Sequence, residues 1–191
     1  PGVGKTTLAK IVASALDRPF YTLSAVTSGV KDVREVIDKA KNQHLFNARP
    51  AFLFIDEIHR FNKSQQDSLL GAVEQGIVTL IGATTENPSF EVISPLLSRC
   101  QVYVLKPMDD GELQTLLDRA LSTDPELQKR NISVKETEAL FRFSGGDARK
   151  LLNIIELVTN SGVNIIDNET VTKQLQQNPV AYDKDGELHY D

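Results

Sequence analysis

The chain begins with Pro1-Gly2-Val3-Gly4-Lys5-Thr6-Thr7, and an apolar helical pattern follows directly. This order matches the C-terminal part of the phosphate-binding loop G-x-x-x-x-G-K-[ST]. Glycines let backbone N–H groups surround a phosphate, and the helix N-terminus adds its positive end. We therefore expect residues 2–7 to bind nucleotide phosphates, with Lys5 at the β- and γ-phosphates and Thr6 on Mg²⁺. The alternative is a glycine-rich turn that only starts a helix.

A second motif, Phe52-Leu53-Phe54-Ile55-Asp56-Glu57, is an apolar run that ends in two adjacent carboxylates. Asp56, at the end of a buried strand, can hold Mg²⁺ through water. Glu57 can polarise an attacking water, which is the general-base role that phosphoryl transfer to water requires. A strand that runs into a solvated acidic turn is the alternative, and the phosphate-binding loop upstream argues against it.

A third motif is the stretch at 80–88, Leu-Ile-Gly-Ala-Thr-Thr-Glu-Asn-Pro, in which an apolar strand changes into small polar residues. It places the hydroxyls of Thr84 and Thr85 at the C-terminal end of a strand, where ligands bind in open α/β sheets. Two arginines follow, Arg99 in Ser-Arg-Cys and Arg149 at a predicted helix start. Arginine stays ionised and its planar fork suits phosphate oxygens. Taken singly, these features also fit a hydroxyl-rich turn and surface salt bridges.

The composition is that of an ordinary globular protein, with 191 residues, 40% apolar and 25% charged side chains. The net charge of −5 argues against a generic polyanion-binding protein, which usually carries a basic excess. The single cysteine cannot form an internal disulfide and suits a reducing compartment. No apolar run approaches the roughly 18 residues of a membrane span, so we expect no membrane association. Disulfide-framed, collagenous, membrane and disordered classes are therefore excluded.

The pattern divides the chain near residue 105. Helical stretches alternate before this point with short β-rich runs, as in βαβ units with a parallel sheet. The predicted strands are Phe20–Leu23, Ala51–Ile55, Val78–Gly82 and Val102–Leu105. The second of them is apolar without alternation, which is typical of a strand buried on both faces. Residues 1–105 are thus predicted to form an α/β domain.

After Pro107 we expect helices and no strands, so residues 106–178 should form a small helical domain. Asp147 and Asn168 are the expected N-caps of its third and fourth helices. Residues 179–191 are mostly polar, with a net charge of −3, and are predicted to be a linker.

Taken together and in this order, the motifs resemble those of an AAA+ ATPase: Walker A, Walker B, sensor 1, arginine finger and sensor 2. Asp-Glu-Ile-His at 56–59 and Ser-Arg-Cys at 98–100 are similar to the clamp-loader branch. The stretch at 82–90, Gly-Ala-Thr-Thr-Glu-Asn-Pro-Ser-Phe, resembles more narrowly the replication-associated recombination protein A family. Residues 182–191 look like that family's linker into a C-terminal oligomerisation domain.

The resemblance implies a parallel-sheet AAA+ core and a helical lid. A complete member has a strand and the first P-loop glycine before the position of Pro1, so we expect a core whose N-terminal strand is missing. It also implies ATP and Mg²⁺ as cofactors. It implies that residues 2–7 bind phosphate, that Thr6 and Asp56 bind the metal, and that Glu57 activates the water. Thr85 is the implied sensor 1 residue, with Thr84 as second choice. Arg99 is the implied arginine finger, which reaches the nucleotide of a neighbouring subunit, and Arg149 is the implied sensor 2 residue, which contacts the nucleotide of its own subunit.

The same resemblance implies a DNA-stimulated ATPase of the bacterial cytoplasm and nucleoid that acts in replication-fork maintenance, recombination and repair. The implied partners are single-stranded, fork or end DNA, single-strand-binding protein and further copies of the chain, as a tetramer. Within this chain, Arg60 and Lys63 are a candidate local DNA contact. His44, His59, His189 and Cys100 are too scattered for a zinc site, and we interpret them as structural or solvent-facing.

The sequence leaves two other functions open, namely a clamp-loader ATPase subunit and a nucleotide-gated scaffold that does not hydrolyse ATP. A clamp-loader ATPase subunit shares most of the motifs. Holliday-junction motors share Gly-Ala-Thr-Thr, but they usually place a basic residue where this chain has Glu86. A nucleotide-gated scaffold that does not hydrolyse ATP would commonly lack the P-loop lysine or the Walker B glutamate. Because Lys5 and Glu57 are both present, the sequence favours hydrolysis.

Overall fold

A computed structural model of the chain describes residues 2–46 and 49–178, without the side chains of residues 44–46. The chain divides into two compact units. One runs from Gly4 to Val104, and the other contains the described residues from Leu105 onward together with Gly2 and Val3. Among the described helices, none is long and apolar enough to cross a membrane. The predicted linker at 179–191 lies outside the described residues.

The first unit contains a parallel three-stranded sheet in the order β1-β2-β3. Its strands are β1 (Phe20–Ser24), β2 (Ala51–Asp56) and β3 (Val78–Gly82), so three of the four predicted strands are confirmed. The central strand, β2, is buried on both faces, as its unbroken apolar run predicts. Its register pairs Asp56 with Ser24 and Ile55 with Gly82, so the three strands end at the same edge.

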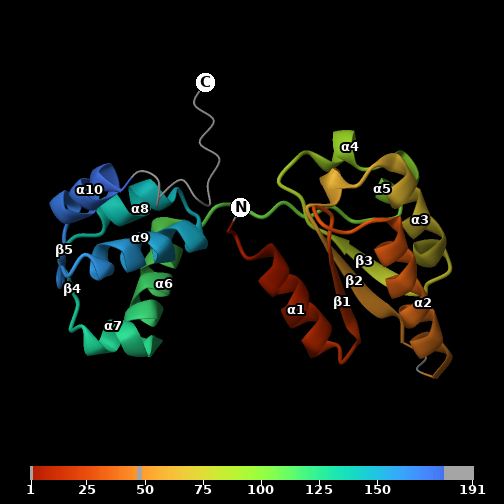
Figure 1. Cartoon of the computed structure of the whole chain (residues 1–191), viewed down its shortest axis with the longest axis horizontal. Helices are drawn as coiled ribbons and strands as arrows, with labels where there is room; N and C mark the ends of the chain where they lie inside the picture. The colour runs from red at the N-terminus through yellow and green to blue at the C-terminus, as the bar shows by residue number, and fades with distance from the viewer. Residues whose placement is uncertain (1, 47–48, 179–191) are drawn as a thin grey trace. The chain divides into compact units, whose positions relative to one another are not determined.

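Helices cover both faces of this sheet (Figure 1). On one face lies α1 (Lys5–Ala15), whose Ala9 shares a small core cluster with Phe54 of β2 and Ala83. The opposite face carries α2 (Val30–Phe46) and α3 (Lys63–Glu74), which pack on the alternate β2 residues. The shorter elements are η1 (Ile58–Arg60), α4 (Pro88–Glu91) and α5 (Ser94–Leu97). The expected α/β class with a parallel sheet is therefore confirmed.

The fourth predicted strand, Val102–Leu105, is wrong. These residues have no regular secondary structure, and the side chains of Tyr103 and Val104 are 80% and 84% exposed. Their β-branched and aromatic composition favours an extended chain, but a strand also needs a neighbouring strand to bond to its backbone. None of the three strands of this sheet pairs with the segment.

The second unit is mainly helical, but the expectation that it lacks strands is wrong. Two short parallel strands, β4 (Ser133–Val134) and β5 (Ile165–Ile166), pair within it. Their two-residue length is too short for a periodic sequence pattern to reveal. Its helices are α6 (Asp110–Thr123), α7 (Pro125–Lys129), α8 (Glu138–Ser144), α9 (Ala148–Asn160) and α10 (Asn168–Gln177). They bury a core of leucine, isoleucine, valine and alanine side chains.

One of the two predicted caps in this unit is confirmed. The Asp147 side chain accepts a hydrogen bond from the Lys150 backbone at 3.0 Å and caps α9. The other prediction is wrong by one residue, because Asp167 caps α10 and Asn168 is the first helical residue. The Thr170 backbone N–H donates to Asp167 at 2.8 Å and holds the pKa of that carboxyl below its ordinary value.

Candidate nucleotide-binding and hydrolysis site

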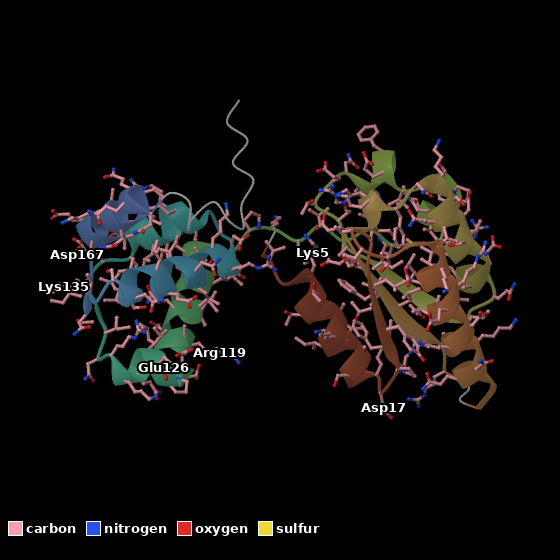
Figure 2. All side chains as sticks on the ribbon, in the orientation of Figure 1. Lys5, Asp17, Arg119, Glu126, Lys135 and Asp167 are labelled. Atoms are coloured by element: carbon pink, nitrogen blue, oxygen red, sulfur yellow. The ribbon has the colours of Figure 1, made fainter. Side chains whose placement is uncertain are left out.

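The predicted phosphate-binding loop has the backbone that such a loop requires. Gly2 and Gly4 both have positive φ values, 69° and 84°, which favour glycine. Gly4 precedes α1, and no side chain caps this helix end. The first N–H groups of α1 therefore stay available to an anion, which supports binding of a phosphate. Lys5 lies at this end of α1 (Figure 2).

The acidic motif and the start of α1 face the same edge of the sheet. Asp56 is the last residue of β2, at the carboxyl end of the central strand. Ala9, one turn into α1, packs on Phe54, two residues before Asp56. A helix that returns across a parallel sheet begins at the carboxyl edge of its strands, which is where ligands bind. The packing thus directs Thr6 and Asp56, the two predicted Mg²⁺ ligands, toward one edge.

Glu57 follows directly, in a left-handed backbone conformation with φ 54° and ψ 45°. This residue starts the turn η1, and its side chain is 31% exposed. The Thr85 hydroxyl lies 3.5 Å from Glu57 Oε2, so the loop after β3 reaches the carboxylate that follows β2. The structure therefore brings together the predicted general base and the preferred sensor 1 residue.

His59 contacts the same group. Its Nε2 lies 3.3 Å from Glu57 Oε2, and its Nδ1 lies 2.9 Å from the hydroxyl of Thr84. From the sequence, this histidine is expected to be structural or solvent-facing, and neither contact is predicted. Its position two residues after Glu57 was the available signal, but the spacing alone does not show that η1 turns the ring back toward the carboxylate.

The two predicted arginines lie in different units. Arg99 follows α5, and its guanidinium pairs with Glu74 Oε1 at 2.6 Å and donates to the Pro95 carbonyl at 2.6 Å. Its side chain is 41% exposed, so part of the guanidinium faces solvent. Arg149 is exposed in the first turn of α9, in the helical unit. Within its own unit, Arg99 is held by Glu74 of α3 and by Pro95 of α5.

Arg60 lies directly beside Glu57, since its backbone N–H donates to the Glu57 carbonyl at 2.8 Å. Arg60 and Lys63 are both exposed, at the end of η1 and the start of α3. Within residues 2–46 and 49–178, no cluster of His, Cys, Asp or Glu side chains could hold a metal ion by itself. The side chain of His44 and all of His189 lie outside the described residues.

The free helix N–H groups and the Lys5 ammonium suit phosphate oxygens, and the Thr6 hydroxyl and the Asp56 carboxylate suit Mg²⁺. Together these groups fit a nucleoside triphosphate whose phosphates share a Mg²⁺ ion.

Comparison with known proteins identifies the family. The sequence model of AAA, the ATPase family associated with various cellular activities, matches residues 1–108. The chain belongs to the AAA family. A second model, the AAA C-terminal domain, matches residues 126–191. The first of these models describes a family of ATPases.

Two relatives of this AAA chain carry informative names. Replication-associated recombination protein A of Haemophilus influenzae is 44% identical over 201 residues, a match that covers 100% of this chain and 44% of that protein. ATPase WRNIP1 of Dictyostelium discoideum is 43% identical over 214 residues, covering 100% of this chain and 24% of that protein. The expected similarity to replication-associated recombination proteins is confirmed. The chain spans less than half of the length of each relative.

Among solved structures, the AAA chain resembles RuvB of Thermotoga maritima, a Holliday junction branch migration motor. The TM-score is 0.69 at 29% identity, and the match covers 93% of this chain and 59% of that one. The resemblance confirms the α/β fold and its helical extension.

Proposed function

We propose that this chain is the ATPase part of a protein that hydrolyses ATP with Mg²⁺ and acts in replication-fork maintenance, recombination and repair of DNA. The observation that carries the ATPase proposal is the position of Glu57. Its carboxylate lies at the carboxyl edge of the sheet, toward which the start of α1 is directed, and the Thr85 hydroxyl lies 3.5 Å from it. The names of the relatives support the DNA-related role.

In this proposal, the N–H groups of residues 2–7 and the Lys5 ammonium bind the phosphates. Thr6 and Asp56 hold Mg²⁺, which when bound neutralises charge on the phosphate oxygens. Glu57 accepts a proton from the attacking water and orients it, which is the role of a general base. Thr85 senses the γ-phosphate, and Arg149 contacts the nucleotide of its own subunit when the two units close over it.

The proposal includes oligomerisation and DNA as partners. Arg99 contacts the nucleotide of a neighbouring copy, and its partly exposed guanidinium supports this role. The acidic net charge of −5 supports a local DNA contact, such as Arg60 with Lys63, over a broad basic face. A tetramer, single-strand-binding protein as a partner and the bacterial nucleoid as location stay predictions.

The phosphate-binding part of the proposal is tested with Lys5→Ala in the intact protein, with Lys10→Ala as matched control. Lys10 is exposed on the same helix, one and a half turns away. We expect Lys5→Ala to weaken ATP binding at least tenfold, measured by isothermal titration calorimetry, because a charge-assisted contact to phosphate is lost. Lys10→Ala should bind as the wild type does. Equal ATP affinity of the two variants would contradict the proposal.

A further inference from the structure

We propose that His59 is a positioning residue for ATP hydrolysis, which orients the Glu57 carboxylate and connects it to the loop after β3. The inference rests on the proposed function, in which Glu57 is the general base. A row of contacts connects the Glu86 backbone with the Glu57 carboxylate through Thr84 and His59. The Glu86 backbone N–H donates to the Thr84 hydroxyl at 2.9 Å, this hydroxyl lies 2.9 Å from His59 Nδ1, and His59 Nε2 lies 3.3 Å from Glu57 Oε2.

The Glu57 carboxylate, which only accepts when ionised, selects the imidazole tautomer. The Thr84 hydroxyl accepts from the Glu86 N–H, and its own proton can go to His59 Nδ1 at 2.9 Å or to the Glu86 carbonyl at 3.5 Å. A neutral imidazole that accepts at Nδ1 carries its proton on Nε2. That proton points to Glu57 Oε2, which can only accept when it is ionised. Glu57 therefore requires the proton on Nε2, and the Thr84 hydroxyl can donate to the Nδ1 that is left as an acceptor.

The backbone holds the two loops in place for this contact. The Ala83 N–H donates to the Ile55 carbonyl at 2.9 Å, and the Ile58 N–H donates to the Ala83 carbonyl at 2.9 Å. Gly82 permits this close approach, because a Cβ there would lie 3.0 Å from Ile58 Cδ1. These hydrogen bonds hold the turn η1 against the end of β3, so that His59, in the middle of η1, lies beside Thr84.

The geometry also separates the two carboxylate oxygens of Glu57. His59 and Thr85 both approach Oε2, and among the described residues no side-chain hydrogen bond or ion pair of Glu57 goes to Oε1. The His59 side chain is only 11% exposed, so its hydrogen bonds are partly shielded from water. Anchoring Oε2 fixes the rotation of the carboxylate and directs Oε1 outward. An oriented oxygen is what a general base needs to accept a proton from water.

The test compares variants of the intact protein that keep or remove the donor at position 59. His59→Phe keeps a planar ring without the N–H, and His59→Gln keeps an N–H donor. Because outer contacts that orient a reacting group typically contribute about 10–100-fold to activity, we expect kcat for ATP to fall by about that factor in His59→Phe. We expect KM and ATP affinity to change little, and His59→Gln to recover part of kcat. Thr84→Ser should retain more activity than Thr84→Val.

Two further measurements separate a positioning role from a structural one. In the Glu57→Gln background, His59→Phe should cause no additional loss of kcat, because both act through one carboxylate. In the nucleotide-free wild type, ¹⁵N NMR of the imidazoles should show His59 with its proton on Nε2, and Thr84→Val should shift these signals. The spectrum of His59→Gln assigns the His59 signals by difference.

The outcomes are distinguishable. If Glu57→Gln hydrolyses ATP as fast as the wild type, the proposed function fails. If Glu57→Gln is inactive but His59→Phe keeps the wild-type kcat, only the role of His59 fails. A proton on Nδ1 of His59, or additive losses in the double variant, would also overturn it. If His59→Phe does not fold, His59→Gln and the NMR spectrum of the wild type still decide the question.

Discussion

At the scale of single residues, the backbone of Glu57 links function to a cost in stability. Its φ of 54° lies in the left-handed region, which residues with a Cβ adopt at a cost of about 1–2 kcal/mol. A residue there would ordinarily be glycine or asparagine. The conformation turns the chain sharply after β2 and starts η1, so that both Glu57 and His59 face the loop after β3. The turn that forms the proposed site therefore costs free energy of folding.

This strain predicts that, at position 57, the glycine variant is more stable than the alanine variant, which is the reverse of the order inside a helix. Glu57→Gly should be more stable than Glu57→Ala by about 1 kcal/mol, because glycine adopts positive φ without a Cβ clash. Urea unfolding followed by circular dichroism measures the difference. Asp67, which is exposed in the middle of α3, gives the matched control. There Asp67→Gly should be less stable than Asp67→Ala by about 1 kcal/mol. The same order at both positions would contradict the left-handed conformation.

At the scale of elements, a buried glutamine holds the segment that carries Arg99. Gln66 on α3 is 2% exposed. Its amide nitrogen donates to the carbonyls of Phe61 and Glu91 at 3.0 and 2.9 Å, and its oxygen accepts from the Ile93 N–H at 2.9 Å. Ile93 is the N-cap of α5. One side chain thus fixes the end of α4 and the start of α5 against α3.

We expect Gln66→Leu to destabilise the first unit by about 2–4 kcal/mol. The leucine has a similar volume, but it leaves an N–H and two carbonyls without this partner, and each unsatisfied buried group costs about 1–3 kcal/mol. Part of that cost is recovered where the loop moves and water enters. Asp67→Asn, at the exposed neighbouring position, should change stability by less than about 0.5 kcal/mol. Thermal and urea unfolding measure both, and equal stability of the two variants would show that the Gln66 network contributes nothing.

Much of the fold follows from local pattern. Ala51–Ile55 is apolar at every position, and only a strand covered on both faces buries all of them. The segment Val102–Leu105 has the same local preference, yet pairing depends on a neighbour that local sequence does not specify. The N-cap of α10 shows that local sequence does not determine a helix boundary to the single residue. Asp167 and Asn168 are both good N-caps, and packing selects Asp167 because Asn168 accepts instead from the Ala139 N–H.

The site is predictable to the extent that its residues lie at strand ends and at a helix start. Glu57 and Thr85 follow neighbouring strands of a parallel sheet, so their proximity could be expected from the pattern. The contacts of His59 could not, because they depend on the left-handed turn at Glu57 and on the bond from Ile58 to Ala83. The pairing of Arg99 with Glu74 joins two segments 25 residues apart, and no local signal indicates it.

At the scale of the whole molecule, the pairing of Arg99 bears on a site shared between copies. An exposed ion pair such as Arg99–Glu74 contributes at most about 1 kcal/mol. A triphosphate of a neighbouring copy, with its larger charge, can therefore compete for the guanidinium. In the proposed oligomer, the triphosphate would replace Glu74 as the partner of Arg99.

Complementation between variants tests whether Arg99 of one copy acts on the nucleotide bound by another copy. Arg99→Ala should bind ATP nearly as the wild type does, but lose about 10³-fold or more in kcat, because an arginine supplied in trans contributes roughly 10³–10⁵ in rate. Mixing it with Lys5→Ala should restore part of the phosphate release, since an intact P-loop then meets an intact Arg99. Mixed oligomers are verified by co-purification of differently tagged copies. Mixed oligomers that form without any recovery would show that Arg99 acts only as a surface residue.

The central claim is that Glu57 activates water for ATP hydrolysis, and single-turnover hydrolysis by Glu57→Gln tests it most directly. The amide keeps the shape of the side chain and removes its basicity. Glu91→Gln, an exposed glutamate on α4, is the matched control. We predict that Glu57→Gln binds ATP with about wild-type affinity and hydrolyses it at least 100-fold more slowly, while Glu91→Gln is unchanged. Hydrolysis by Glu57→Gln at the wild-type rate would contradict the account.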